Sequence, residues 1–262
     1  MNSNHFSLLV CPICKTSFSN KSNQLICQNN HKIINKNNIL NLIPEGRKIK
    51  LTTAQKSGSW KITSFLYERI WRNQSLSIMT IGKFSVSKEL EILHNFCSSL
   101  PTQSYVCDLT CSTGLYGRFI LENFINFNVY FLDYSETMLI DSQKRNSAPE
   151  RSCYVQNYAE NITFIENSLD AVVCGASWNE ITKTGETVSN VYQSLKSGGK
   201  TFWMGILKSE KRIGTVIQKF ASASGGLHFD SAEFVENTFL THGFKNIKSA
   251  KYGTIFIMTA EK

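Results

Sequence analysis

The sequence predicts an α/β protein with a mostly parallel β-sheet, helices on both of its faces, and a small cysteine-rich module at its N-terminus. From residue 104 onward, short apolar runs typical of buried strands alternate with segments whose apolar residues recur at helical spacing. Such alternation is typical of βαβ units, which form parallel sheets. Three cysteines and a histidine crowd into residues 11–31, whereas the other cysteines are scattered and several lie inside apolar runs. This placement indicates a metal site and buried thiols rather than a disulfide framework.

The amino-acid composition indicates a globular protein. The chain has 262 residues, of which 42% are hydrophobic and 11% aromatic, so a packed core is expected and global disorder is excluded. We expect no membrane span, because no stretch approaches about 20 apolar residues, and a cytoplasmic location, because no targeting signal is visible. The net charge of +8 is compatible with an anionic partner such as RNA or a lipid surface. The excess of lysine and asparagine favours compositional drift instead.

Three segments follow from the pattern: a metal-binding module at 1–45, a linker with helices at 46–103, and the sheet domain at 104–262. Helices are expected at 62–75, 87–100, 115–127, 136–146, 188–196 and 231–242. Strands are expected at 104–109, 128–132, 152–156, 169–175, 200–205, 245–251 and 254–260, the last two pairing as a hairpin.

A strand, loop and helix are predicted for YVCDLTCSTGLYGRFI, with Asp108 at the end of the strand and Gly117 where the helix begins. Asp133 ends the next strand, where a carboxylate can bind both hydroxyls of a ribose. A carboxylate at Asp108 would repel a pyrophosphate but suits the ammonium group of a methionine moiety. The pair therefore favours S-adenosylmethionine over a dinucleotide.

Four motifs together resemble those of class I S-adenosylmethionine-dependent methyltransferases: DLTCSTGLYG, FLDYSETML, NYAENITFIENSLDAVV and VYQSLKSGGKTF. The resemblance covers about residues 62–262. It implies a Rossmann-like seven-stranded sheet, mostly parallel, with an antiparallel last strand. It also implies that the cofactor is lined by Tyr67, Arg72, Asp108, Thr110, Cys111, Ser112, Gly114, Asp133, Tyr134, Asn157, Tyr158, Ala159 and Gly175.

Within that set, the resemblance places Asp108, Cys111 and Gly114 at the methionine part, Asp133 at the ribose, and residues 157–159 at the adenine. The sequence departs from the family at three points. Thr110 and Ser112 replace two glycines of the loop, Tyr158 replaces an aspartate that bonds the adenine amino group, and residues 196–197 lack the usual proline. These departures leave open a degenerate pocket without cofactor.

The metal constellation begins with Cys11-Pro-Ile-Cys14 and continues, after twelve residues, with Cys27 and then His31. Three thiolates and one imidazole complete a tetrahedral zinc site with no open position, so the zinc should be structural. Metal binding would supply much of the folding free energy of so short a segment. CPIC…LICQNNHKIINKNNILNLIP resembles the zinc ribbon of bacterial ribosomal-RNA guanine-N1 methyltransferases, a ribbon that can help to grip RNA.

A second resemblance concerns the linking helix. SFLYERIWR is similar to a motif in plant and cyanobacterial methyltransferase-like proteins of plastid lipid bodies. That resemblance implies that Tyr67, Trp71 and Arg72 form part of a lid over the cofactor. The alternative is an ordinary amphipathic helix.

The acceptor is expected near GASWNEITK, which follows the fourth strand of the sheet. Trp178 could stack on a planar acceptor, and Asn179 or Glu180 could orient or deprotonate it. The alternatives are a helix cap at Asn179 and a solvated acid at Glu180. His228 is a further candidate base.

Three functions stay open at this point: methyl transfer to a small aromatic or lipophilic molecule, methylation of a ribosomal-RNA guanine, and a non-methylating binding or accessory role. We favour the small-molecule acceptor over RNA, because the linking helix is rich in bulky apolar residues and arginine, the better RNA reader, is sparse.

Overall fold

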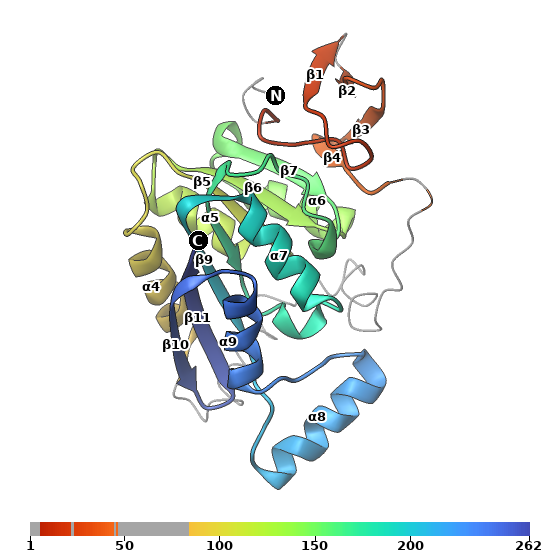
Figure 1. Cartoon of the computed structure of the whole chain (residues 1–262). Helices are drawn as coiled ribbons and strands as arrows, with labels where there is room; N and C mark the ends of the chain where they lie inside the picture. Colours follow the sequence, from red (N-terminus) through yellow and green to blue (C-terminus); the bar gives the residue numbers. More distant parts are fainter. Residues whose placement is uncertain (1–5, 22–23, 45, 47–83) are drawn as a thin grey trace.

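The computed structural model describes residues 6–21, 24–44, 46 and 84–262 (Figure 1). The expected helix at 62–75 lies outside these described residues, and with it Tyr67, Trp71 and Arg72. Among the helices that are described, none is long and apolar enough to cross a membrane.

The predicted seven-stranded sheet is confirmed, with the strand order β7-β6-β5-β8-β9-β11-β10. Its strands are β5 (Tyr105–Leu109), β6 (Asn128–Asp133), β7 (Ser152–Gln156), β8 (Leu169–Cys174), β9 (Leu195–Ile206), β10 (Lys245–Tyr252) and β11 (Ile255–Glu261). Strands β5 to β9 run parallel, and β11 is antiparallel to both of its neighbours. Because β5 lies beside both β6 and β8, the topology switches there, where α/β sheets bind ligands.

Helices cover both faces of this sheet. Those described are α4 (Val86–Cys97), α5 (Leu115–Asn123), α6 (Glu136–Arg145), α7 (Thr184–Ser194), α8 (Arg212–Gly225) and α9 (Ala232–Thr241), with 3₁₀ turns η2 (Pro149–Arg151), η3 (Ala159–Asn161) and η4 (Trp178–Glu180). Apolar side chains of α4, α5 and α6 belong to one core layer, and those of α7 and α9 to the other. Helix α8 was not predicted.

The segment around Gly198 differs from the prediction. A turn was expected at residues 197–199, but β9 begins at Leu195 and runs through them. Its pairing with β8 shifts register between Leu169 and Ala171, and Gly198 has a φ of 74°. A glycine can adopt this left-handed conformation at little cost, so β9 continues through the register shift instead of ending there.

The cysteine-rich module extends the same sheet. Its strands β1 (Phe18–Lys21), β2 (Gln24–Cys27), β3 (Lys32–Lys36) and β4 (Ile39–Asn41) form an antiparallel ribbon, and β4 pairs in parallel with β7, which gives an 11-stranded sheet. The ribbon's Leu9, Leu40 and Leu42 share one hydrophobic cluster with Leu132 and Val155 of the central strands. The ribbon is therefore packed onto the edge of the sheet, as the red and orange strands of Figure 1 show.

Candidate functional site

Two carboxylates mark the carboxyl ends of β5 and β6. The Oδ2 atom of Asp108 accepts a hydrogen bond from the backbone N–H of Gly117 at 2.8 Å, which ties the end of β5 to the first turn of α5. Asp133 accepts backbone N–H groups from Ser112 at 2.8 Å and Ser135 at 2.9 Å. Both acids are buried, so their orientations are fixed by the loop that they hold.

In the loop that follows Asp108, every second residue from Thr110 to Gly114 has a left-handed backbone conformation. Thr110, Ser112 and Gly114 have φ angles of 56°, 51° and 79°, all in the left-handed region. This explains why the resembling family has glycines at the first two positions, since a side chain there strains the backbone by roughly 1–2 kcal/mol per residue. Between them, the N–H of Cys111 bonds the carbonyl of Leu132 at 3.0 Å and holds the loop against β6.

Close packing of α5 explains the two glycines that the loop retains. A Cβ on Gly114 would lie 2.1 Å from Oγ of Ser142, and a Cβ on Gly117 would lie 2.3 Å from the ring of Phe131. Neither distance is possible for real atoms. Glycine at these positions lets α5 approach β6 and α6 closely, with its N-terminus directly after the loop.

Two tyrosines, one after the carboxyl end of β6 and one after that of β7, lie side by side. The rings of Tyr134 and Tyr158 are nearly parallel, with an interplanar angle of 7° and centroids 6.4 Å apart. Tyr158 precedes η3, whose loop is held by Asn157: the Asn157 amide donates to the carbonyl of Asn161 at 2.6 Å, and its oxygen accepts the N–H of Tyr158 at 2.9 Å. Asn157 is completely buried and Ala159 is nearly so, so they shape this loop from beneath.

Glu180 and Asp133 influence one another electrostatically. Burial raises the pKa of Asp133 to about 6, although backbone N–H donors oppose the shift. Burial, and then the charge of Asp133, raise the pKa of Glu180 to about 7. Burial and the charges of Asp133, Glu180 and Tyr158 also raise the pKa of Tyr134. The structure therefore brings together an acidic and aromatic group of side chains from three separate loops.

Trp178 and Asn179 are both enclosed by the fold, the first by core side chains and the second by backbone carbonyls. Trp178 is completely buried, stacks on Phe239, and donates from Nε1 to Asp230 at 2.9 Å. The Asn179 amide donates to the carbonyl oxygens of Ile206 at 2.8 Å and His228 at 2.7 Å. Because the indole of Trp178 is packed in the core and the amide of Asn179 is engaged by two backbone carbonyls, we propose no contact with the acceptor for either residue.

His228 lies beside these residues although it is 49 positions further along the chain than Asn179. Its Nε2 is 3.3 Å from Oδ2 of Asp230, the same carboxylate that accepts the Trp178 indole. Asp230 was not among the predicted site residues, although the His-x-Asp spacing of residues 228–230 indicates it. Tyr116 was not predicted either; it donates to the buried Glu89 of α4, and its ring would lie 2.8 Å from a Cβ on Gly175.

Comparisons with known proteins agree on one family. A methyltransferase domain family matches residues 106–199, which contain the loop, both acids and Glu180. An uncharacterised chloroplastic methyltransferase of Arabidopsis thaliana is 24% identical over 97% of this chain and 79% of its own length. The ubiquinone/menaquinone biosynthesis C-methyltransferase of Wigglesworthia glossinidia brevipalpis is 28% identical over 47% of this chain and 50% of its length. Among solved structures, Haemonchus contortus phosphoethanolamine N-methyltransferase 2 in complex with S-adenosyl-L-methionine shares the fold, with a TM-score of 0.67 and 17% identity over 84% of this chain and 61% of its own.

This chain is an S-adenosylmethionine-dependent methyltransferase.

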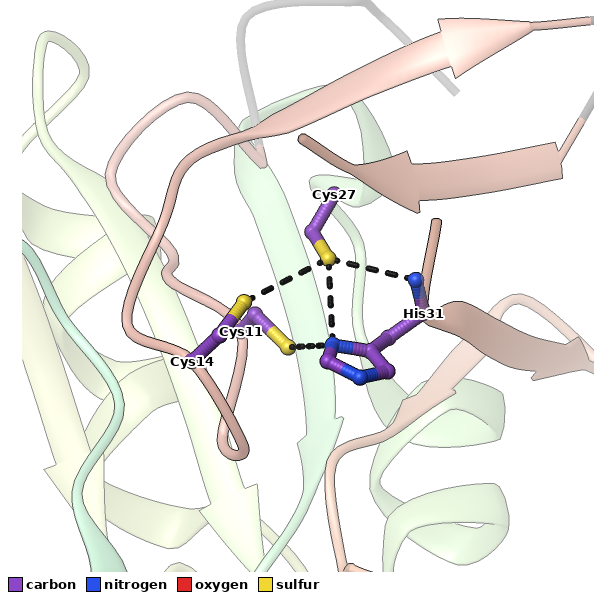
Figure 2. Close-up of side chains that lie close together, drawn as sticks. All are labelled: Cys11, Cys14, Cys27 and His31. Carbon is purple, nitrogen blue, oxygen red and sulfur yellow. Dashed lines mark hydrogen bonds between the residues drawn. The ribbon is translucent and has the colours of Figure 1, made fainter. Parts of the chain in front are cut away.

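The methyltransferase carries a second site, in its ribbon. Cys11, Cys14, Cys27 and His31 direct their ligand atoms toward one point, all within 4.8 Å of one another (Figure 2). His31 Nδ1 lies 3.5 Å from Sγ of Cys11 and 3.4 Å from Sγ of Cys27, and the Cys14 and Cys27 sulfurs are 3.5 Å apart. In a tetrahedral zinc site, sulfur–nitrogen separations are about 3.5 Å and sulfur–sulfur separations about 3.8 Å, from the usual bond lengths.

The donor set of the ribbon therefore fits zinc. Hydrogen bonds from the hydroxyl and backbone of Thr16 lower the pKa of Cys14 to about 5, which favours the thiolate that a metal requires. Lys15 and Asn30 have φ angles of 60° and 62° and turn the two short loops that present the ligands. Within the described part of the methyltransferase, this is the one group of three or more possible ligands close enough to hold a metal ion.

Proposed function

We propose that this methyltransferase transfers the methyl group of S-adenosylmethionine to a small aromatic or lipophilic acceptor. The observation that carries the proposal is the position of Glu180, whose carboxyl group is close enough to Asp133 and Tyr134 to interact with both electrostatically. An acid beside the methyl donor disfavours an approaching phosphate backbone and suits a small acceptor that loses a proton on methylation. The Wigglesworthia relative, by its name, methylates intermediates of quinone biosynthesis.

The cofactor would lie over the carboxyl ends of β5 and β6. In this proposal Asp133 accepts the ribose hydroxyls, and Tyr134 and Tyr158 flank the adenine. The loop from Thr110 to Gly114 surrounds the methionine part. Asp108, which accepts the N–H of Gly117, would meet the cofactor's ammonium directly or through water. Bound there, the cofactor supplies an activated methyl group, and holding the acceptor in line with it supplies much of the acceleration.

Glu180 is our candidate for a general base. Its pKa of about 7 places it close to the operating pH, where a side chain transfers protons most effectively. It would receive the proton that a phenol or hydroquinone loses as it takes up the methyl group. His228 is the second candidate, since its ring is one-third exposed and paired with Asp230.

A matched pair of variants tests the role of Glu180. Glu180→Gln should reduce kcat at least tenfold and remove the acid limb of the pH profile near 7, with little effect on cofactor affinity. Glu186→Gln, which removes an exposed acid paired with Lys183, should leave both unchanged. An unaltered pH profile in Glu180→Gln would exclude Glu180 as the base.

Ribosomal RNA is the second candidate acceptor, and one observation favours it. The ribbon exposes Lys15, Lys32 and Lys36, although Lys36 also lies 3.5 Å from Glu136. The two acceptors are distinguished by following radiolabelled methyl from the cofactor to a long-chain hydroquinone or to protein-free ribosomal RNA. We expect label in the hydroquinone, and salt-sensitive labelling of RNA alone would overturn the proposal.

We also propose that Cys11, Cys14, Cys27 and His31 hold a structural zinc ion. Metal analysis of the purified chain should find one zinc per protein, lost in Cys27→Ser. Loss of the metal would also affect the segment that follows η3, on the proposed adenine side of the site. The ribbon is bonded to that segment, because the N–H of Val10 donates to the carbonyl of Thr163 at 2.9 Å.

A further inference from the structure

Helix α8 presents an apolar stripe to solvent. Ile213, Val216, Ile217 and Phe220 are 78%, 67%, 63% and 73% exposed, and the helix has no buried residue. Their spacing of three, one and three residues places all four on one side of an α-helix. Figure 1 shows α8, in light blue, standing away from the sheet and its covering helices. A largely exposed apolar stripe of this kind is unusual on a monomeric domain and marks an interaction surface.

The orientation of the stripe is fixed from the opposite side of α8. Gln218 accepts the N–H of Ser209 at 2.7 Å and donates to the carbonyl of Leu207 at 2.8 Å, and Thr215 donates to the carbonyl of Ser209 at 3.1 Å. A Cβ on Gly214 would lie 2.1 Å from Oγ of Ser209, so the helix is also in close contact with the preceding loop. These contacts hold the polar side of α8 to the protein and turn the apolar side outward.

The charge beside the stripe is positive. Arg212 and Lys219 lie within α8, which contains no acidic residue, and Lys208 and Lys211 precede it, with Glu210 as the one acid between them. A helix with an exposed apolar face flanked by lysine and arginine suits the interface of an anionic bilayer, where apolar side chains enter the acyl boundary and cations meet the headgroups. Pairing with a second copy of α8 would instead bring like charges together.

We propose that α8 docks this methyltransferase on the surface of an anionic lipid bilayer. The helix lies at the acceptor edge of the sheet: the chain enters it from the carboxyl end of β9, and on its return His228 donates its N–H to the carbonyl of Asn179 at 3.1 Å. Docking through α8 therefore brings η4 and Glu180 close to the lipid. The proposal rests on α8 alone and does not depend on which acceptor is methylated.

Sedimentation with vesicles tests the docking. The full chain is mixed with phosphatidylcholine vesicles containing about 30% phosphatidylglycerol, and separately with pure phosphatidylcholine vesicles. We expect binding to the anionic vesicles, at least tenfold weaker binding to the neutral ones, and loss of binding at high salt. The double variant Ile213→Ser/Ile217→Ser should bind at least tenfold more weakly, because two apolar side chains no longer enter the bilayer.

The chain offers a matched control. Ile125→Ser/Ile34→Ser removes two isoleucines that are 76% and 60% exposed, close to the 78% and 63% of Ile213 and Ile217, and it should bind vesicles like the parent. Equal loss of binding in both double variants, or no binding of the parent to anionic vesicles, would overturn the proposal. So would a dimer, detected by light scattering, that the Ile213→Ser/Ile217→Ser variant abolishes, since a second copy would then cover α8.

Discussion

Replacing Gly117 with alanine tests whether the close contact between α5 and β6 positions the cofactor loop. The added Cβ would lie 2.3, 2.6 and 2.9 Å from three atoms of the Phe131 ring. That ring is completely buried and stacked on Tyr154 with centroids 4.7 Å apart, so it has little room to move. Overpacking of this kind costs about 1–3 kcal/mol. Because the ring is blocked on its far side, we take the upper end, about 3 kcal/mol.

Alanine also has the better helix propensity, by about 1 kcal/mol. Gly117→Ala should therefore lower the free energy of unfolding by about 2 kcal/mol, measured by urea denaturation. Gly185→Ala is the matched control, since Gly185 also lies in the first turn of a helix but its added Cβ would meet His242 at an ordinary 3.6 Å. That control should be stabilised by up to about 1 kcal/mol. Equal stabilisation of both variants would refute the close-packing argument.

Three further predictions follow from the site and the ribbon. Thr110→Gly relieves a left-handed backbone at φ 56° and should raise the free energy of unfolding by up to about 1 kcal/mol after the entropy of glycine is subtracted; a lower urea midpoint would contradict it. The raised pKa of Glu180, about 7, means that its ionisation opposes folding as the pH rises from about 4.5 to 7, so Glu180→Gln should stabilise the cofactor-free protein at pH 8 by up to about 3 kcal/mol, and by less at pH 5. A gain in urea denaturation that does not change with pH would refute this. Removal of zinc by a strong chelator should lower Tm and weaken cofactor binding together, because Val10 bonds Thr163 beside the adenine loop; unchanged calorimetric affinity in the metal-free chain would separate the two sites.

Much of the sheet could be predicted from the sequence, because its strands are buried on both faces and separated by amphipathic helices. β7 begins and ends where predicted, and the strand ends at Asp108 and Asp133 fell within a residue of the prediction. The left-handed angles at Thr110 and Ser112 could not be derived from residue type, since both residues usually avoid that region. Only the resemblance to a glycine-containing loop pointed to them.

The roles around η4 were harder to predict. A tryptophan next to an asparagine in a loop has the composition of an acceptor site, but burial against Phe239 depends on long-range packing that no local pattern reveals. Helix α8 was missed for a related reason. Its apolar stripe Ile213–Phe220 has helical spacing, yet the segment is rich in serine and glycine and joins no core layer. The contact between β4 and β7 likewise joins residues more than 100 positions apart.

Calorimetric titration of the zinc-loaded chain with S-adenosylhomocysteine measures whether the carboxyl ends of β5 and β6 bind the methyl-donor cofactor. We predict one site per chain for the parent protein. We also predict at least tenfold weaker binding to Asp133→Asn, which keeps the size of the side chain but removes the charge that accepts the ribose hydroxyls. A folded, zinc-loaded chain that takes up no cofactor, or an Asp133→Asn variant that binds like the parent, would contradict these predictions.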